Sequence, residues 1–234
     1  MKQLTFGVIV GNRGFFPDEL ARDGRRTVLS VLKKHRIKAV CLAPQSTKFG
    51  AVETFDDAKK CAELFKKNAD TIDGILVTLP NFGDEKGVAT AIRLSGLDVP
   101  VLVQAEPDVQ ETMDITHRRD SFCGKISVCN NLRQFGIPYS LTQFHTEALE
   151  SEEFAEDLDY FCAVCRTVGG LKNARVGAIG ARPAAFTTVR YSEKLLEESS
   201  ISVEPVDLSE IVGAAEAMKK TSPPVKAKLK ALQE

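Results

Sequence analysis

The chain has no run of about 18 consecutive apolar residues, and this excludes a membrane-spanning helix. It also has no excess of positive charge, since 31 Lys and Arg against 32 Asp and Glu give a formal net charge of -1. Binding to nucleic acid or to an anionic membrane would need a basic excess, so we expect neither partner. The first residues include no small-residue cleavage site, which favours a first β-strand over a signal peptide. We therefore expect a cytoplasmic protein.

Several cofactor and catalytic motifs are missing as well. The Gly11-x-Arg13-Gly14 segment lacks the third glycine and the acidic residue of a dinucleotide-binding fingerprint, and the chain has no GxxxxGK[ST] phosphate loop. Cys162 and Cys165 are spaced like a redox or zinc pair, but no second ligand pair follows at zinc spacing. No convergent set of metal ligands and no Ser/His/Asp or Cys/His motif can be assembled. The sequence thus predicts no resident metal or cofactor in this chain.

The chain has six cysteines. Most of them fall inside predicted strands and helices, in a chain too large to depend on disulfides and without a secretory signal. We therefore predict reduced, buried thiols for all of them: Cys41, Cys61, Cys123, Cys129, Cys162 and Cys165.

Short apolar runs alternate with amphipathic helical segments along the first 170 residues. Predicted strands cover residues 4–10, 37–43, 74–79, 99–103 and, as a fifth strand, 139–144. Strands that are apolar throughout and alternate with helices are typical of a parallel sheet covered on both faces. The pattern predicts an α/β fold with a flavodoxin-like or Rossmann-like parallel sheet in an N-terminal domain, residues 1–170.

The composition becomes acidic after residue 146, and this acidic segment leads into a long predicted helix. We expect Gly169 and Gly170 to end that helix. A new series then begins, with predicted strands at 174–179 and 201–206 and a helix after each. Two βα units make too small a sheet to stand alone with both faces covered. We therefore interpret residues 171–234 as an incomplete second α/β domain of βαβα order.

The segment 114–138 is the most unusual part of the sequence. It opens with a histidine, two arginines and an aspartate (117–120), and a helix follows at once. Asp120 or Ser121 is expected to cap this helix, and Gly136 with Pro138 to end it. Three- and four-residue spacing predicts a buried apolar face made of Phe122, Ile126, Cys129, Leu132 and Phe135.

Loops that follow the predicted strands carry the candidate binding residues. In open α/β sheets ligands bind beyond the carboxyl ends of the strands, where the loops 11–14, 80–83, 104–121 and 180–183 would lie. These loops offer amides, guanidinium groups and aromatic rings, which suit a polyhydroxylated ligand such as a sugar, and their arginines also suit a sugar that bears an anionic group. The alternative is that their glycines and prolines merely form turns.

The same loops carry a family resemblance. Residues 10–26, 78–105, 114–142 and 174–211, including the runs VGNRGFFPDELARDGRR and DITHRRDSFCGKISVCNNLRQFGIP, resemble the L-fucose/L-arabinose isomerase family, and specifically its fucose-isomerase-like members. The resemblance implies an enzyme that interconverts an aldose and a ketose with a divalent ion, commonly Mn²⁺, while a carboxylate shuttles a proton. It also implies a homo-oligomer, a trimer or hexamer.

The resemblance further implies that this chain is the N-terminal half of a longer enzyme whose metal ligands lie beyond these 234 residues. The chain would then supply substrate-pocket loops and oligomer contacts, and would be inactive alone. The substrate-binding role would fall on Arg13, Asn81, Phe82, His117, Arg118, Arg119, Ser121 and Arg182. A stand-alone sugar- or anion-binding module without catalysis remains the alternative hypothesis.

Overall fold

The computed structural model describes residues 2–114, 116–172 and 174–233. The chain divides into two compact units, Met1–Gly169 and Gly170–Glu234, and each is described separately below. Among the described residues, no helix combines the length and the apolar character that crossing a bilayer requires.

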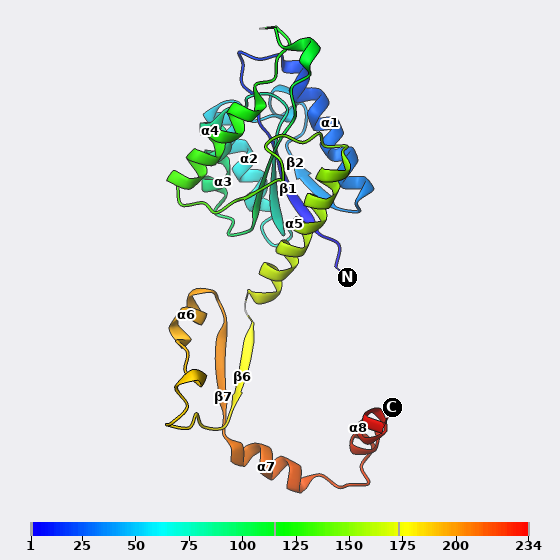
Figure 1. Cartoon of the computed structure of the whole chain (residues 1–234), viewed down its shortest axis with the longest axis vertical. Coiled ribbons are helices and arrows are strands. Elements are labelled where there is room, and N and C mark those ends of the chain that lie inside the picture. The colour runs from blue at the N-terminus through cyan, green and yellow to red at the C-terminus, as the bar shows by residue number, and fades with distance from the viewer. Residues whose placement is uncertain (1, 115, 173, 234) are drawn as a thin grey trace. The chain divides into compact units, whose positions relative to one another are not determined.

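The first unit is built around a five-stranded parallel sheet (Figure 1). Its strands are β1 (Thr5–Val10), β2 (Lys38–Cys41), β3 (Gly74–Leu79), β4 (Val101–Ala105) and β5 (Ser140–Leu141). Their order across the sheet is β2-β1-β3-β4-β5, and each neighbouring pair is parallel. Every residue of β1, β3 and β4 is buried, as expected for central parallel strands with helices on both faces. The predicted α/β, flavodoxin-like fold is confirmed.

Helices cover the two faces of this sheet in separate layers (Figure 1). The helices are α1 (Asp18–Lys34), α2 (Phe55–Lys67), α3 (Glu85–Ser95), α4 (Ser121–Gln134) and α5 (Glu152–Leu171), with short 3-10 turns η1 (Lys48–Gly50) and η2 (Gln110–Thr112). One apolar core joins the sheet to α2, α3 and α4, for example through Phe65, Val88 and Leu132. The other joins it to α1 and α5, for example through Leu32 and Phe161.

Local signals in the sequence account for several helix ends. Thr54 and Asp57 form a capping box at the start of α2, each side chain accepting a hydrogen bond from the other's backbone N–H. Asp84 caps α3 by accepting from the backbone N–H of Gly87 at 2.6 Å. Gly96 ends α3 in the left-handed conformation, with a φ of 66°, which glycine adopts without strain.

The predicted buried face of α4 is wrong. Phe122, Ile126 and Phe135 are 39%, 56% and 43% exposed, so only two of the five residues expected there are buried. The side that packs inward consists of Ser121, Gly124, Lys125, Val128, Cys129 and Leu132. Gly124 explains the choice of side, because a Cβ at this position would lie 1.8 Å from the carbonyl oxygen of Phe82.

The predicted cap of α4 also needs correction. Asp120 has a φ of 49° and its side chain makes no capping hydrogen bond. The Ser121 hydroxyl donates instead to the backbone carbonyl of Glu106, outside the helix. Asp108 instead binds the backbone just before the helix: its Oδ1 accepts hydrogen bonds from the backbone N–H groups of Arg119 at 2.7 Å and of Asp120 at 3.3 Å.

Other boundaries and burial states differ from the predictions. β5 is limited to two residues, and β2 is shorter than the apolar run that predicted it. Gly169 and Gly170 do not end α5, which continues to Leu171. All six cysteines are free, but Cys123 is exposed and Cys41 is half-buried, so the prediction of uniformly buried thiols is wrong for these two.

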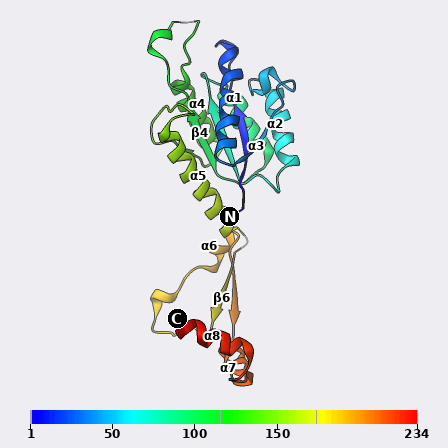
Figure 2. The same cartoon turned by 90° about the vertical axis from the view of Figure 1, so that its right-hand side faces the viewer.

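The second unit contains a parallel pair of strands, β6 (Arg175–Ile179) and β7 (Ser202–Val206) (Figure 2). Its other elements are the 3-10 turn η3 (Thr187–Val189) and the helices α6 (Glu193–Glu198), α7 (Leu208–Ala217) and α8 (Pro223–Gln233). Large apolar side chains on the strand and helices remain uncovered, including Ile179 at 61% and Leu195 at 63% exposure. A two-stranded sheet buries little apolar surface, which explains this exposure.

Candidate functional site

The strand order puts the topological switch point, where open α/β sheets bind ligands, between β1 and β3. In the 2-1-3-4-5 order the chain leaves β1 toward one edge of the sheet and β3 toward the other, so the loops after these strands separate at a topological switch point. The two loops comprise residues 11–17 and 80–84. Residues predicted to bind substrate, Arg13, Asn81 and Phe82, stand in them.

Two buried asparagines fasten these loops together. Asn81 Nδ2 donates to Asn12 Oδ1 at 2.7 Å, and both side chains are fully buried. Asn12 Nδ2 donates in turn to Glu53 Oε2 at 2.7 Å and to Asp18 Oδ1 at 3.2 Å. Asn81 Oδ1 accepts from the Gly83 backbone at 3.0 Å. Because the amide groups of Asn81 are engaged in this network, its structural role is to hold the loops in register.

An aromatic and cationic cluster lies beside this network, and we call it the switch-point cluster: Arg13, Phe15, Phe16, Phe82 and Glu85. The Arg13 guanidinium lies 4.7 Å from the Phe82 ring centroid, and its Nη1 is 3.1 Å from Glu85 Oε2. Phe16 stacks on Phe82 with centroids 5.7 Å apart, and Phe15 packs edge-on against Phe16. Phe15 is 72% exposed, so the cluster presents an aromatic ring to solvent.

The segment before α4 is anchored to the β3 loop through Arg119. The Nη1 of Arg119 donates to the carbonyl oxygen of Pro80 at 2.8 Å, and its backbone N–H donates to Asp108. Ser121, also predicted to bind substrate, is fully buried and bonded to Glu106. These two residues therefore fix the position of the segment, and the Arg119 side chain remains partly exposed.

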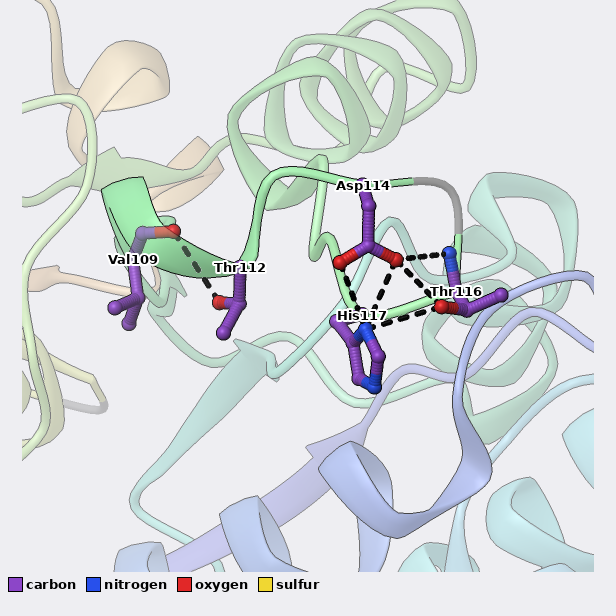
Figure 3. Close-up of polar contacts among 5 residues, drawn as sticks. All are labelled: Val109, Thr112, Asp114, Thr116 and His117. Atoms are coloured by element: carbon purple, nitrogen blue, oxygen red, sulfur yellow. Dashed lines mark hydrogen bonds and ion pairs between the residues drawn. The ribbon is translucent and has the colours of Figure 1, made fainter.

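Arg118 and His117 interact within their own segment. Arg118 Nε lies 3.1 Å from Asp120 Oδ2 as an ion pair, although the angle is not that of a hydrogen bond. His117 Nδ1 lies 2.9 and 2.8 Å from the two carboxylate oxygens of Asp114, and 3.0 Å from the Thr116 hydroxyl (Figure 3). With Nδ1 engaged, the second ring nitrogen points away from the carboxylate (Figure 3).

Asp114 is the most strongly perturbed carboxyl of this loop. The Thr116 hydroxyl and then the His117 ring hydrogen-bond to it and lower its pKa to about 2. The carboxylate is therefore ionised at neutral pH and can hold the His117 ring in one orientation.

Arg182 belongs to the second unit. Its Nη2 lies 2.6 Å from Glu193 Oε1, and its guanidinium lies 4.3 Å from the centroid of Tyr191. This arrangement repeats the combination of carboxylate and ring that surrounds Arg13 in the first unit.

The described residues do not form a manganese site. Over 2–114, 116–172 and 174–233, no three His, Cys, Asp or Glu side chains converge closely enough to hold a metal ion. The carboxylates beside the switch point instead have protein partners, such as Asn12 for Glu53 and Arg13 for Glu85. These residues therefore do not fit the ion that the family resemblance implies.

Several residues of the site were missed by sequence reasoning. Glu53 follows β2 and bonds to Asn12 from a distant part of the chain, and Glu85 belongs to the first turn of α3. Asp108 and Asp114 precede the predicted cluster at 117–120 and support it. For Asp114 a signal existed, since its spacing of three residues from His117 permits a local contact; for Glu53 the sequence holds no comparable signal.

Comparison with known proteins gives one family. Residues 7–172 match the family described as "Fucose/sulfoquinovose isomerase, N-terminal domain". A search among curated proteins gave no significant match. The matched range includes the first unit's sheet, except Thr5 and Phe6 at the start of β1, and the whole switch-point cluster.

Proposed function

Because the chain belongs to the fucose/sulfoquinovose isomerase N-terminal domain family, we propose that it takes part in interconverting an aldose and its ketose. In this proposal the chain binds the sugar with the loops at the switch point between β1 and β3. The observation that carries the proposal is the switch-point cluster, which places a cation, a carboxylate and an exposed ring where α/β proteins bind ligands.

The chemistry of the cluster matches a sugar. A guanidinium donates hydrogen bonds to hydroxyl oxygens, and a carboxylate such as Glu85 accepts them from hydroxyl groups. The exposed ring of Phe15 offers an apolar surface for the C–H face of a pyranose. His117, held by Asp114 through Nδ1, adds its second ring nitrogen as a further hydrogen-bonding group.

Charge pairing at the site favours a neutral sugar. The family description names fucose, which is neutral, and sulfoquinovose, which carries a sulfonate. Arg13 already pairs with Glu85, and Arg118 with Asp120. A sulfonate would have to compete with these carboxylates, whereas a hydroxyl can bond to both members of a pair. We therefore propose a neutral deoxy sugar or pentose as the preferred ligand of these loops.

The described residues would not hold the metal ion of such an isomerase, since no three of their His, Cys, Asp or Glu side chains converge to bind one. In this proposal Mn²⁺ and the proton-shuttling carboxylate are supplied by protein outside them. The residues of this chain bind and orient the sugar, and the second unit belongs to a further α/β domain.

Homo-oligomer contacts form the second part of the proposal. Phe122 and Ile126 on α4 and Leu141 on the edge strand β5 are exposed, at 39%, 56% and 55%, and all three line one surface hollow. Apolar strips beside an open sheet edge are typical of protein–protein contacts. The reversal of the expected α4 face thus supports a subunit interface on this helix.

A calorimetric titration tests the sugar-binding role. The full chain is titrated with L-fucose and with sulfoquinovose, and we expect L-fucose to bind more tightly. Arg13→Ala should weaken L-fucose binding by about tenfold, the effect of losing one hydrogen bond from a charged group. Arg93→Ala is the matched control, because Arg93 lies in the last turn of α3, at the other end from the loops. Equal L-fucose affinity in both variants would contradict the proposal.

A further inference from the structure

A cavity opens on the α1 side of the first unit, and none of the residues of the switch-point cluster lines it. It has a volume of about 220 Å³ and lies between α1, the segment after β4 and the segment before α5. Its charged lining comes from Asp23, Glu106, Arg119 and Glu150. Leu20 and Leu149 contribute apolar surface. We call it the α1 cleft.

Glu106 is built into this cleft with one oxygen held and one available. Its Oε1 accepts from the Leu149 backbone at 3.0 Å and from Gln104 Nε2 at 3.4 Å. Its Oε2 accepts no hydrogen bond from the described part of the chain. Burial raises the pKa of Glu106, which is the expected response of a carboxyl group that has lost water and gained few partners.

Arg119 faces the same cleft with unused donors. Its Nη1 donates to Pro80, while its Nε and Nη2 donate to no other described residue. The hydrogen bond to Pro80 fixes the guanidinium, because Pro80 itself is wedged against Gly24 of α1, where a Cβ would lie 2.4 Å from the Pro80 ring. The cleft therefore combines a fixed cation with a fixed carboxylate.

The composition of the lining indicates the class of ligand. Three carboxylates against one guanidinium disfavour an anion, even though Asp23 is partly neutralised by Arg22 at 3.1 Å and Arg26 at 3.3 Å. A hydroxyl group can donate to a carboxylate and accept from a guanidinium at once, and Thr27 adds a hydroxyl of its own. The leucines suit the carbon skeleton of such a ligand.

We propose that the α1 cleft is a binding site for a small neutral polyol, held by Glu106, Arg119 and Thr27. This inference does not rest on the proposed function, since it uses none of the residues of the switch-point cluster. The polyol is either a free linear polyol or a sugar, and the two sources share the chemistry of adjacent hydroxyl groups.

The test is a titration of the ¹⁵N-labelled full chain, followed by its amide resonances. The probes are erythritol, L-fucose and sodium sulfate, and the reporters of the cleft are the amides of Gly24, Thr27 and Leu149. We expect erythritol to shift these signals and sulfate to leave them unchanged. L-Fucose shifting the same signals more strongly than erythritol would identify a sugar as the occupant.

Two variants decide whether the cleft residues are responsible. Glu106→Gln keeps the oxygen that holds Leu149, and Thr27→Val removes only a hydroxyl. We expect Glu106→Gln to raise the dissociation constant about tenfold and Thr27→Val to raise it severalfold, whereas Glu156→Gln, an exposed change on α5, should have no effect. Unchanged affinity in both cleft variants would overturn the proposal.

The same titration separates this inference from the proposed function. If L-fucose shifts the amides of Arg13 and Phe82 while neither polyol shifts those of the cleft, the inference is overturned and the proposed function stands. If only the cleft amides respond, the inference stands and the switch-point role is refuted.

Discussion

Gly124, near the start of α4, packs against the backbone of Phe82, and its replacement by alanine tests this contact directly. The added Cβ would meet the backbone of Phe82, with the carbonyl oxygen at 1.8 Å, the carbonyl carbon at 2.5 Å and the Cα at 2.8 Å. All three are main-chain atoms, so no side-chain rotation relieves the clash. Either α4 or the loop that carries Phe82 must move.

The expected loss of stability follows from two opposing effects. Replacing a glycine by alanine inside a helix normally stabilises by about 1 kcal/mol. Overpacking costs about 1–3 kcal/mol, and a backbone clash this close belongs at the upper end of that range. We therefore expect Gly124→Ala to lower the free energy of unfolding of the first unit by about 2 kcal/mol. For a unit of this size that corresponds to a Tm about 4–8 °C lower.

Gly169→Ala is the matched control, because Gly169 is also helical, in α5, and a Cβ there meets no atom within 4 Å. This change should be neutral or stabilising by up to about 1 kcal/mol. Both variants are compared with the parent by urea unfolding and by the amide resonances of the loop 80–84. A Gly124→Ala protein as stable as the parent, with unshifted loop resonances, would refute the packing of α4 against Phe82.

Three further predictions concern separate parts of the molecule. The pKa of Asp114, measured by ¹³C NMR, should be about 2, and His117→Gln should raise it toward the ordinary 3.8; an unchanged pKa would argue against the contact between His117 and Asp114. Since the folded pKa is lowered, any stability that this group contributes is present above the ordinary pKa and is lost as the pH falls toward 2. Lys125→Met should lower the free energy of unfolding, measured in urea, by about 2–5 kcal/mol, because the buried ammonium donates to Thr142 and to two backbone carbonyls. The control Lys66→Met, at an exposed position, should change it by no more than about 0.5 kcal/mol, and equal stabilities of the two variants would contradict the prediction. The chain alone should show no aldose–ketose turnover with added Mn²⁺ in a ketose assay, since its described residues lack a metal site; chelator-sensitive turnover on L-fucose would contradict this.

The sheet could be predicted from the sequence because its strands are uniformly apolar and regularly spaced. Burial on both faces leaves such strands no polar positions, and this makes β1, β3 and β4 easy to recognise. The weak strand β5 was predicted too long, since only two of its residues pair with β4. Its pairing depends on the neighbouring strand more than on its own sequence.

The face of α4 could not be predicted, because two sets of residues on this helix satisfy helical spacing. Hydrophobicity favoured the side with Phe122 and Ile126, and the protein buries the side with Gly124 and Lys125. That choice is made by contacts between distant segments: the close approach to Phe82, and the three hydrogen bonds of the Lys125 ammonium group. Periodicity carries no information about either contact.

The candidate site was predicted at the level of loops and not of single side chains. The loops of Arg13 and Phe82 were named from the sequence, whereas the contact between these two side chains was not. Asn81, expected to face the ligand, is instead bonded to Asn12, and Ser121 is buried against Glu106. Short polar side chains at strand ends serve equally well as ligand contacts or as braces between loops, and only the three-dimensional arrangement separates the two uses.

The most direct test of the central claim is to map where L-fucose contacts the full chain by amide chemical shifts. The account predicts that the largest changes fall in the loops 11–17 and 80–84, and that the Arg13→Ala protein needs about tenfold more L-fucose to show them while the Arg93→Ala protein does not. Absence of changes in both loops at saturating L-fucose, or the same concentration dependence in the Arg13→Ala protein as in the parent, would contradict the assignment of the switch point as the sugar-binding surface.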